Sequence, residues 1–142
     1  MTLIIQTGIN NILNTKQSNA NLIFQYRELL RENKDKNIVI TSIIPASNRK
    51  GKLYLRVFEV NNELRNLAKQ EQVTFVDCEQ DFIQNSTLNF HLFKRAGIYL
   101  HLNDSGNELF INKVDAALKR LGIPFLKLTQ VFWNTRPSKR RI

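Results

Sequence analysis

Cysteines and long apolar runs are nearly absent from this sequence. The 142 residues include a single cysteine, Cys78, so no disulfide can form within the chain and a reducing compartment is expected. No apolar run approaches the roughly 18 residues that a transmembrane helix needs. Residues 1–6 provide neither the basic region nor the long apolar region of a signal peptide. The sequence therefore predicts an intracellular, cytoplasmic protein without a membrane anchor.

Residue patterns that hold cofactors are also missing. Cys78, His91 and His101 lack the spacing of metal ligands, and no glycine-rich loop is present to bind a phosphate group. No neighbour of Cys78 activates its thiol, so we expect a buried, inert cysteine. We predict that the protein uses neither a metal ion nor an organic cofactor.

Positive charge is in excess, with 21 Lys and Arg against 12 Asp and Glu and a net charge of +9. Five of these net charges fall in residues 122–142, a stretch without acidic residues. We therefore predict a mildly basic domain at residues 1–121 and a basic, solvated tail at residues 122–142. The alternative is that the tail directs nuclear localisation or contacts nucleic-acid phosphates through Arg136, Lys139, Arg140 and Arg141.

Short apolar runs alternate with helical stripes along the chain. The predicted strands lie at residues 3–7, 38–44 and 73–77, and the predicted helices carry apolar stripes at residues 22–30, 57–68 and 110–121. Strands separated by helices predict an α/β fold, with a parallel sheet of about three strands and helices on its faces. In such sheets, functional residues lie in the loops beyond the carboxyl ends of the strands.

Local signals mark the ends of the predicted helices, and an irregular region separates the last predicted strand from the last predicted helix. Ser18 or Asn19 is the predicted N-cap of the first helix, and Ser105 and Glu108 have the spacing of a capping box for the last helix. Gly122 is a stop signal for that helix. Residues 78–102 are predicted to be irregular, with aromatic side chains packed under a loop and one histidine beside them: Phe82, Phe90, Phe93 and His91.

Three residues near predicted strand ends could take part in chemistry. Gly8 permits a tight turn after the first strand, and Asn10 could present its amide to an oxyanion. His101 precedes the last helix and could act as a general base. Each of them alone is better explained by a turn or a structural hydrogen bond.

Taken together, these features resemble the SGNH (GDSL-like) hydrolases over residues 2–121. Residues 8–11, Gly-Ile-Asn-Asn, resemble block III of that family, and residues 101–106, His-Leu-Asn-Asp-Ser-Gly, resemble block V. The resemblance implies a flavodoxin-like, three-layer α/β/α fold. It also implies that Gly8 and Asn10 belong to the oxyanion hole and that His101 is the catalytic base for ester hydrolysis.

The family's nucleophile block and the orienting carboxylate are both missing. No Gly-Asp-Ser block precedes residue 8, so no nucleophile can be assigned, and Ile98 stands three residues before His101 where the family has Asp. An alternative alignment matches Ala96 to that Asp and Tyr99 to the His. Either way, we expect the C-terminal part of the fold, truncated at its N-terminus and without esterase activity.

The truncation predicts that the strand at residues 3–7 is a bare sheet edge, which a homodimer or a missing N-terminal half would cover. Three functions therefore compete. The first is an inactive hydrolase remnant. The second is an esterase, acting on a small ester, that upstream sequence or a partner chain completes. The third is a nucleic-acid-binding module that uses the basic tail together with Phe132 and Trp133.

Overall fold

A four-stranded parallel sheet forms the centre of the protein. The computed structural model describes residues 2–6, 17–45, 52–84, 87–94, 101–122 and 128–132. The sheet has the order β3-β2-β1-β6, in which the strands are β3 (Thr74–Val76), β2 (Asn37–Thr41), β1 (Thr2–Ile5) and β6 (Leu128–Phe132). Each strand pairs in parallel with its neighbour, as the alternation of strands and helices predicts.

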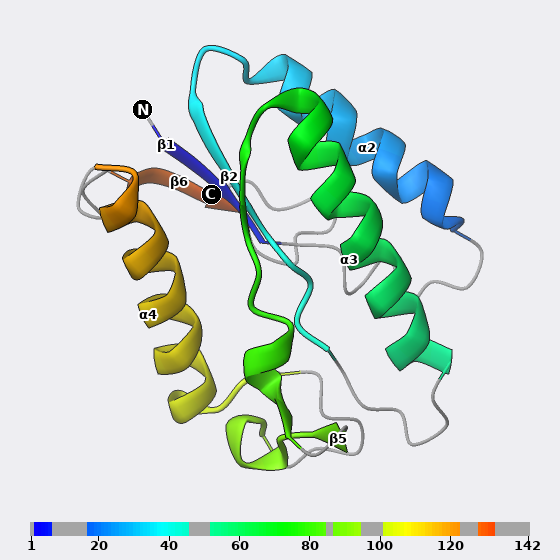
Figure 1. The fold of residues 1–142 in the computed structure, drawn as a ribbon, viewed down its shortest axis with the longest axis vertical. Helices are drawn as coiled ribbons and strands as arrows, with labels where there is room; N and C mark the ends of the chain where they lie inside the picture. The colour runs from blue at the N-terminus through cyan, green and yellow to red at the C-terminus, as the bar shows by residue number, and fades with distance from the viewer. Residues whose placement is uncertain are drawn as a thin grey trace.

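Helices cover the sheet on both sides (Figure 1). Helices α2 (Asn19–Glu32) and α3 (Lys52–Glu71) pack on the face to which Leu3 and Ile5 point. Helix α4 (Asp104–Arg120) packs on the other face, against Ile4 and its neighbours. Because successive strand residues point to opposite faces, a strand that is apolar throughout serves both cores. The predicted three-layer α/β/α architecture is confirmed.

The sheet edge at β1 differs from the prediction. Residues 128–132 lie within the predicted basic tail, yet they form β6 and pair in parallel with β1. The ladder aligns Leu3 with Gln130 and Ile5 with Phe132, with a register shift between Thr2 and Leu3. The expected bare edge is therefore wrong: the C-terminal region supplies a fourth strand, and β1 has a neighbour on each side.

The segment between β3 and α4 is built from short elements. It contains the 3-10 helix η1 (Gln80–Phe82), the antiparallel strands β4 (Ile83–Gln84) and β5 (Thr87–Leu88), and the 3-10 helix η2 (Phe90–Leu92). Phe82 and Phe93 are buried and meet edge to face, with ring centroids 6.0 Å apart. Phe90 is 48% exposed and His91 is also exposed, so the prediction that they pack in this aromatic cluster is wrong.

The helix ends confirm some of the predicted caps and correct others. Ser18 caps α2, because its side chain accepts a hydrogen bond from the Asn21 backbone N–H. At α4 the N-cap is Asn103, whose side chain accepts a hydrogen bond from the Gly106 N–H, so the predicted capping box at Ser105 is wrong.

At the other end of α4, Gly122 follows the helix with φ 71°, a left-handed conformation that glycine adopts without steric cost. Leu121 is 48% exposed, which corrects its place in the predicted buried stripe.

None of the helices in the described ranges is long and apolar enough to cross a membrane.

Candidate functional site

Asn61 anchors the chain at the carboxyl end of β2. It lies on the buried face of α3 and is fully buried. Its Oδ1 accepts a hydrogen bond from the Ile43 N–H at 2.7 Å, and its Nδ2 donates to the Ile43 carbonyl at 2.9 Å. This pairing satisfies both backbone groups of Ile43 just after the point where β2 ends at Thr41. The strand is therefore shorter than the predicted 38–44.

Arg65, one turn further along α3, holds the segment that follows β3. Its Nη2 lies 2.6 Å from Asp77 Oδ2 and 3.6 Å from Glu79 Oε2, and its guanidinium stacks over the Phe75 ring at 5.3 Å. Glu79 is buried. Burial raises the pKa of Glu79, and the neighbouring negative charge of Asp77 raises it further, while Arg65 opposes them.

Ser42 and Cys78 complete this polar cluster and are not poised for nucleophilic chemistry. Both side chains are fully buried, and Ser42 Oγ accepts a hydrogen bond from the Cys78 N–H at 2.8 Å. Burial raises the pKa of the Cys78 thiol to about 12, assisted by the negative charges of Asp81 and Asp77. The thiol therefore stays protonated near neutral pH, and the predicted buried, inert cysteine is confirmed.

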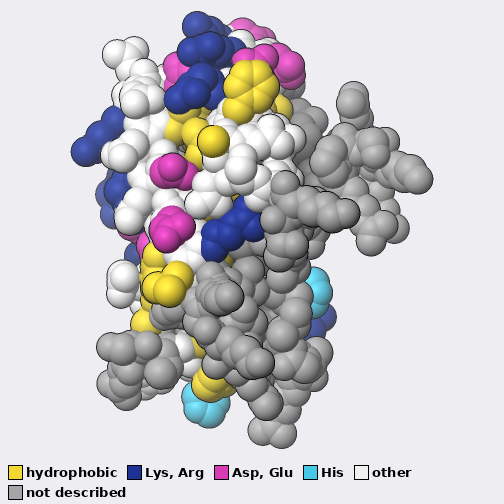
Figure 2. Space-filling view, turned by 90° about the vertical axis from the view of Figure 1, so that its right-hand side faces the viewer, with side chains coloured by type: hydrophobic (Ala, Val, Ile, Leu, Met, Phe, Trp, Pro, Cys, Tyr) yellow, Lys and Arg dark blue, Asp and Glu magenta, His cyan; other side chains and the backbone are white. Residues whose placement is uncertain are grey.

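His101 stands at the surface in a short antiparallel pairing. Its carbonyl accepts a hydrogen bond from the Lys94 N–H at 2.8 Å, and the next residue, Leu102, forms a bridge with Phe93. The side chains of both histidines in the chain are exposed (Figure 2). Within the described ranges, no side chain hydrogen-bonds the His101 imidazole.

Asn103 and Gly106 fix the position of this histidine relative to α4. Asn103 Nδ2 donates to the carbonyls of His91 at 2.7 Å and Phe93 at 3.3 Å, while its Oδ1 caps α4. A Cβ on Gly106 would lie 2.2 Å from the Leu92 carbonyl oxygen, so only glycine permits this close approach. The Asn and Gly of the block V-like motif thus have a structural role that the sequence pattern did not indicate.

The structure brings few of the predicted site residues together. Gly8 and Asn10 lie outside the described residues, as do Ile98, with the rest of residues 95–100, and the four tail cations: Arg136, Lys139, Arg140 and Arg141. The described site consists of His101 and the cluster around Asn61 and Arg65. Asn61 is a polar residue within the apolar stripe of α3, and this interruption of the stripe was the sequence signal that could have revealed the cluster.

Each of the three carboxylates that follow β3 lies near a cation. Asp77 and Glu79 bind Arg65, and Asp81 lies 3.2 Å from Lys113 Nζ on α4. In the described part of the chain, no group of three His, Cys, Asp or Glu side chains is arranged to hold a metal ion. The chemistry that this arrangement supports directly is hydrogen bonding and ion pairing within the protein.

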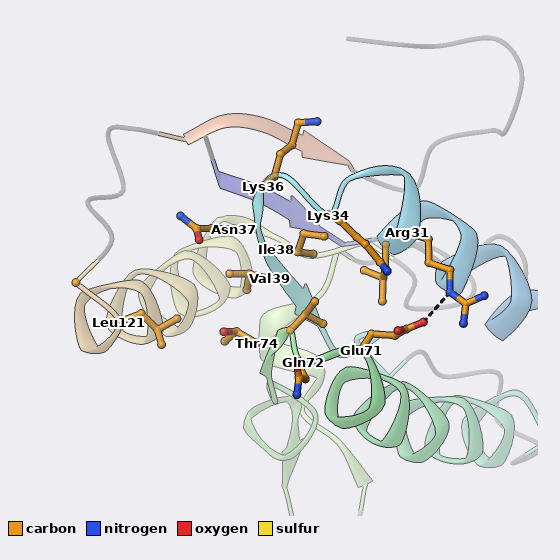
Figure 3. A pocket seen from close by; sticks show the side chains of 13 residues that line it. Arg31, Lys34, Lys36, Asn37, Ile38, Val39, Glu71, Gln72, Thr74 and Leu121 are labelled. Carbon is orange, nitrogen blue, oxygen red and sulfur yellow. Dashed lines mark hydrogen bonds and ion pairs between the residues drawn. The ribbon is translucent and has the colours of Figure 1, made fainter.

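A hollow of about 550 Å³ lies at the opposite end of the strands (Figure 3). Its walls come from the ends of α2, α3 and α4 and from the beginnings of β2 and β3, and Arg31 pairs with Glu71 at 3.1 Å on one side. The 17 residues of α4 span about 25 Å at 1.5 Å per residue, and they separate this hollow from His101. The hollow is therefore not part of the candidate site.

The face formed by α2 and α3 carries charges of both signs. Figure 2 shows Lys and Arg side chains beside Asp and Glu side chains there, and Glu71 lies within 4 Å of both Arg27 and Arg31. Paired charges of this kind do not create the single-sign field that attracts nucleic acid.

The comparisons with solved structures agree with this geometry. The chain superposes on a GDSL-like lipase from Bacteroides thetaiotaomicron with a TM-score of 0.72, covering 83% of this chain and 62% of that one at 16% identity. The chain has the fold of the C-terminal part of an SGNH (GDSL-like) hydrolase. A lipase/acylhydrolase from Enterococcus faecalis shows the same SGNH-like fold, with a TM-score of 0.70, 15% identity and coverage of 83% and 60%.

A shorter solved structure is matched over nearly all of its own length by this chain. The esterase domain of the ORF1 protein from the zebrafish ZfL2-1 retrotransposon gives a TM-score of 0.62 at 16% identity, covering 83% of this chain and 98% of that one. By contrast, the chain spans about three fifths of the length of the two bacterial enzymes. No protein-family model matches the chain, and no curated protein matches it in sequence.

Proposed function

We propose that this chain is an SGNH-type acylhydrolase domain that is catalytically inactive on its own. One observation carries the proposal: within the described part of the chain, no carboxylate contacts the His101 imidazole to orient it. Residues 95–100 contain no Asp or Glu, and none of the described carboxylates forms a hydrogen bond or ion pair with the imidazole. The exposed Asp104, three residues after His101, begins α4 and makes no such contact. A histidine without that partner is neither held in the right tautomer nor stabilised once it is protonated.

The size of the expected loss supports inactivity rather than reduced activity. A catalytic triad works as a unit, and loss of its nucleophile or base alone costs on the order of a million-fold in rate. The oxyanion hole and substrate binding retain roughly a thousandfold over water, and only when the pocket around them is complete. Ser42, the serine that follows β2, is fully buried and hydrogen-bonded, so it does not replace the missing nucleophile.

The test is hydrolysis of p-nitrophenyl acetate by the full chain and by two histidine variants. His101→Ala removes the candidate base, and His91→Ala is the matched control because His91 is also exposed. We expect a low wild-type rate and a similar small decrease in both variants, since exposed imidazoles attack this ester without an active site and each variant removes one of them. A wild-type rate that falls in His101→Ala and not in His91→Ala contradicts the proposal.

The second candidate is an active esterase, and the zebrafish retrotransposon domain favours it. That structure is called an esterase domain, and it is almost fully covered by a chain of this size. An active enzyme would need a nucleophile from outside the described residues, acting on a small acyl ester through His101. The same experiment separates the two candidates, because only an active enzyme loses turnover selectively in His101→Ala.

A further inference from the structure

Glu79 is a buried carboxyl group whose hydrogen bonding is incomplete. It is 5% exposed, and its Oε1 has no hydrogen-bond partner, alone among the buried side-chain oxygen and nitrogen atoms of the described residues. An ionised carboxylate in such a position is costly, because burial removes the water that would stabilise its charge. The protonated acid carries no charge and therefore loses much less on burial.

The groups that face Glu79 do not supply a full counter-charge. From α3, the Asn61 amide and the Arg65 guanidinium face it. Arg65 is closer to Asp77, at 2.6 Å, than to Glu79, at 3.6 Å, so one cation serves two carboxylates. From α4, Lys113 pairs with Asp81 on η1, and these two charges act on the neighbouring Cys78. Asp77 repels a second negative charge at Glu79.

We propose that Glu79 is a proton-controlled latch that holds the segment following β3 against α3 when it is neutral and releases that segment when it ionises. The segment is short, and contacts other than Glu79 also hold it, because Ser42 Oγ accepts a hydrogen bond from the Cys78 N–H at 2.8 Å and Lys113 pairs with Asp81. Ionisation of Glu79 therefore raises the population of the released state without making that state the major one. The Glu79 N–H donates to Asp77 Oδ1 at 3.1 Å, and the Phe82 N–H donates to the Glu79 carbonyl at 3.3 Å. The segment leads into η1 and β4, so its release opens the carboxyl end of the sheet.

The raised pKa of Glu79 sets the sign of the pH dependence. At low pH the carboxyl is protonated in both the latched and the released state, and protonation favours neither. As the pH rises past the ordinary glutamate value, the released state ionises first and gains population. The shift is complete above the pKa of the latched state. The latch is therefore closed in acid and loosens towards neutral pH.

Amide hydrogen exchange on the full chain at pH 5 and pH 8 tests the latch. After correction for intrinsic rates, the Cys78 and Phe82 amides should lose protection between these pH values relative to the Tyr26 amide in α2. Each pKa unit by which Glu79 is raised corresponds to a loss of protection of about tenfold over the whole transition. The loss between pH 5 and pH 8 is smaller, since the released state already begins to ionise below pH 5. Glu79→Gln should keep the same protection at both pH values, because glutamine does not titrate.

Glu63→Gln is the matched control, since Glu63 lies on α3 and is exposed; this variant should retain the wild-type pH dependence. A wild-type protection that changes by less than about twofold, or a dependence that persists in Glu79→Gln, overturns the proposal. If Glu79→Gln does not fold, carbon-13 titration of the wild type decides. The Glu79 midpoint should lie above the ordinary glutamate value, and a midpoint at or below that value refutes the latch. None of these readouts depends on ester hydrolysis.

Discussion

The two ends of the parallel strands are constructed in different ways. At the carboxyl end, buried polar side chains bind specific backbone groups, as Asn61 does at Ile43. At the amino end, three helices terminate around an open hollow, and the ion pair between Arg31 and Glu71 lies at the surface. Removing one partner of a buried hydrogen bond leaves an unsatisfied group and costs stability, because water cannot replace that partner. Removing one partner of an exposed ion pair changes the free energy of unfolding very little. The carboxyl end should therefore be far less tolerant of substitution than the amino end.

Asn61→Ala should have the largest effect on stability. It leaves the Ile43 N–H and C=O without their partners in a buried position. Each unsatisfied buried group costs about 1–3 kcal/mol, so we expect a loss on the order of 3 kcal/mol in the free energy of unfolding, measured by urea denaturation. Asn112→Ala, at an exposed position on α4, is the control and should change it by less than about 0.5 kcal/mol. Similar losses in both variants would remove the basis for the comparison.

Gly106→Ala should have the next largest effect. The new methyl group would lie 2.2 Å from the Leu92 carbonyl oxygen, so α4 or η2 must shift. Overpacking of this kind costs typically about 2 kcal/mol, even though alanine is the better helix former. Thermal unfolding measures the loss, with the exposed Ser105→Ala as the control, expected to be nearly neutral. A neutral Gly106→Ala would mean that the carboxyl end adapts as readily as the amino end.

Gln72→Gly should have the smallest effect, and it should stabilise the protein. Gln72 follows α3 at the amino end with φ 57°, the only described non-glycine residue with a positive φ. Glycine adopts this conformation without steric cost, so we expect a gain of about 0.5–1 kcal/mol in urea denaturation. Gln70→Gly, inside the last turn of α3, should instead lose about 1 kcal/mol. A loss at both positions would show that the Gln72 side chain makes a contact that outweighs the backbone strain.

Local sequence patterns were sufficient for most of the fold. The β-branched run that forms β2, the apolar stripes of α2, α3 and α4, and the Ser18 cap are all properties of neighbouring residues, and the structure confirms them. The site was harder to predict. His101 was found through a motif, but its exposure and the pairing of Lys94 with its carbonyl depend on how the segment from β3 to α4 folds back on itself.

The sequence by itself determined the alternation of strands and helices and the absence of an acidic residue just before His101, because periodicity and composition are local properties. Only the tertiary structure decided that residues 128–132 pair with β1, that Arg65 serves both Asp77 and Glu79, and that Asn103 rather than Ser105 caps α4. Each of these features depends on which backbone groups and charges are brought within hydrogen-bond distance by packing. Residues far apart in the chain carry no local signal of such contacts.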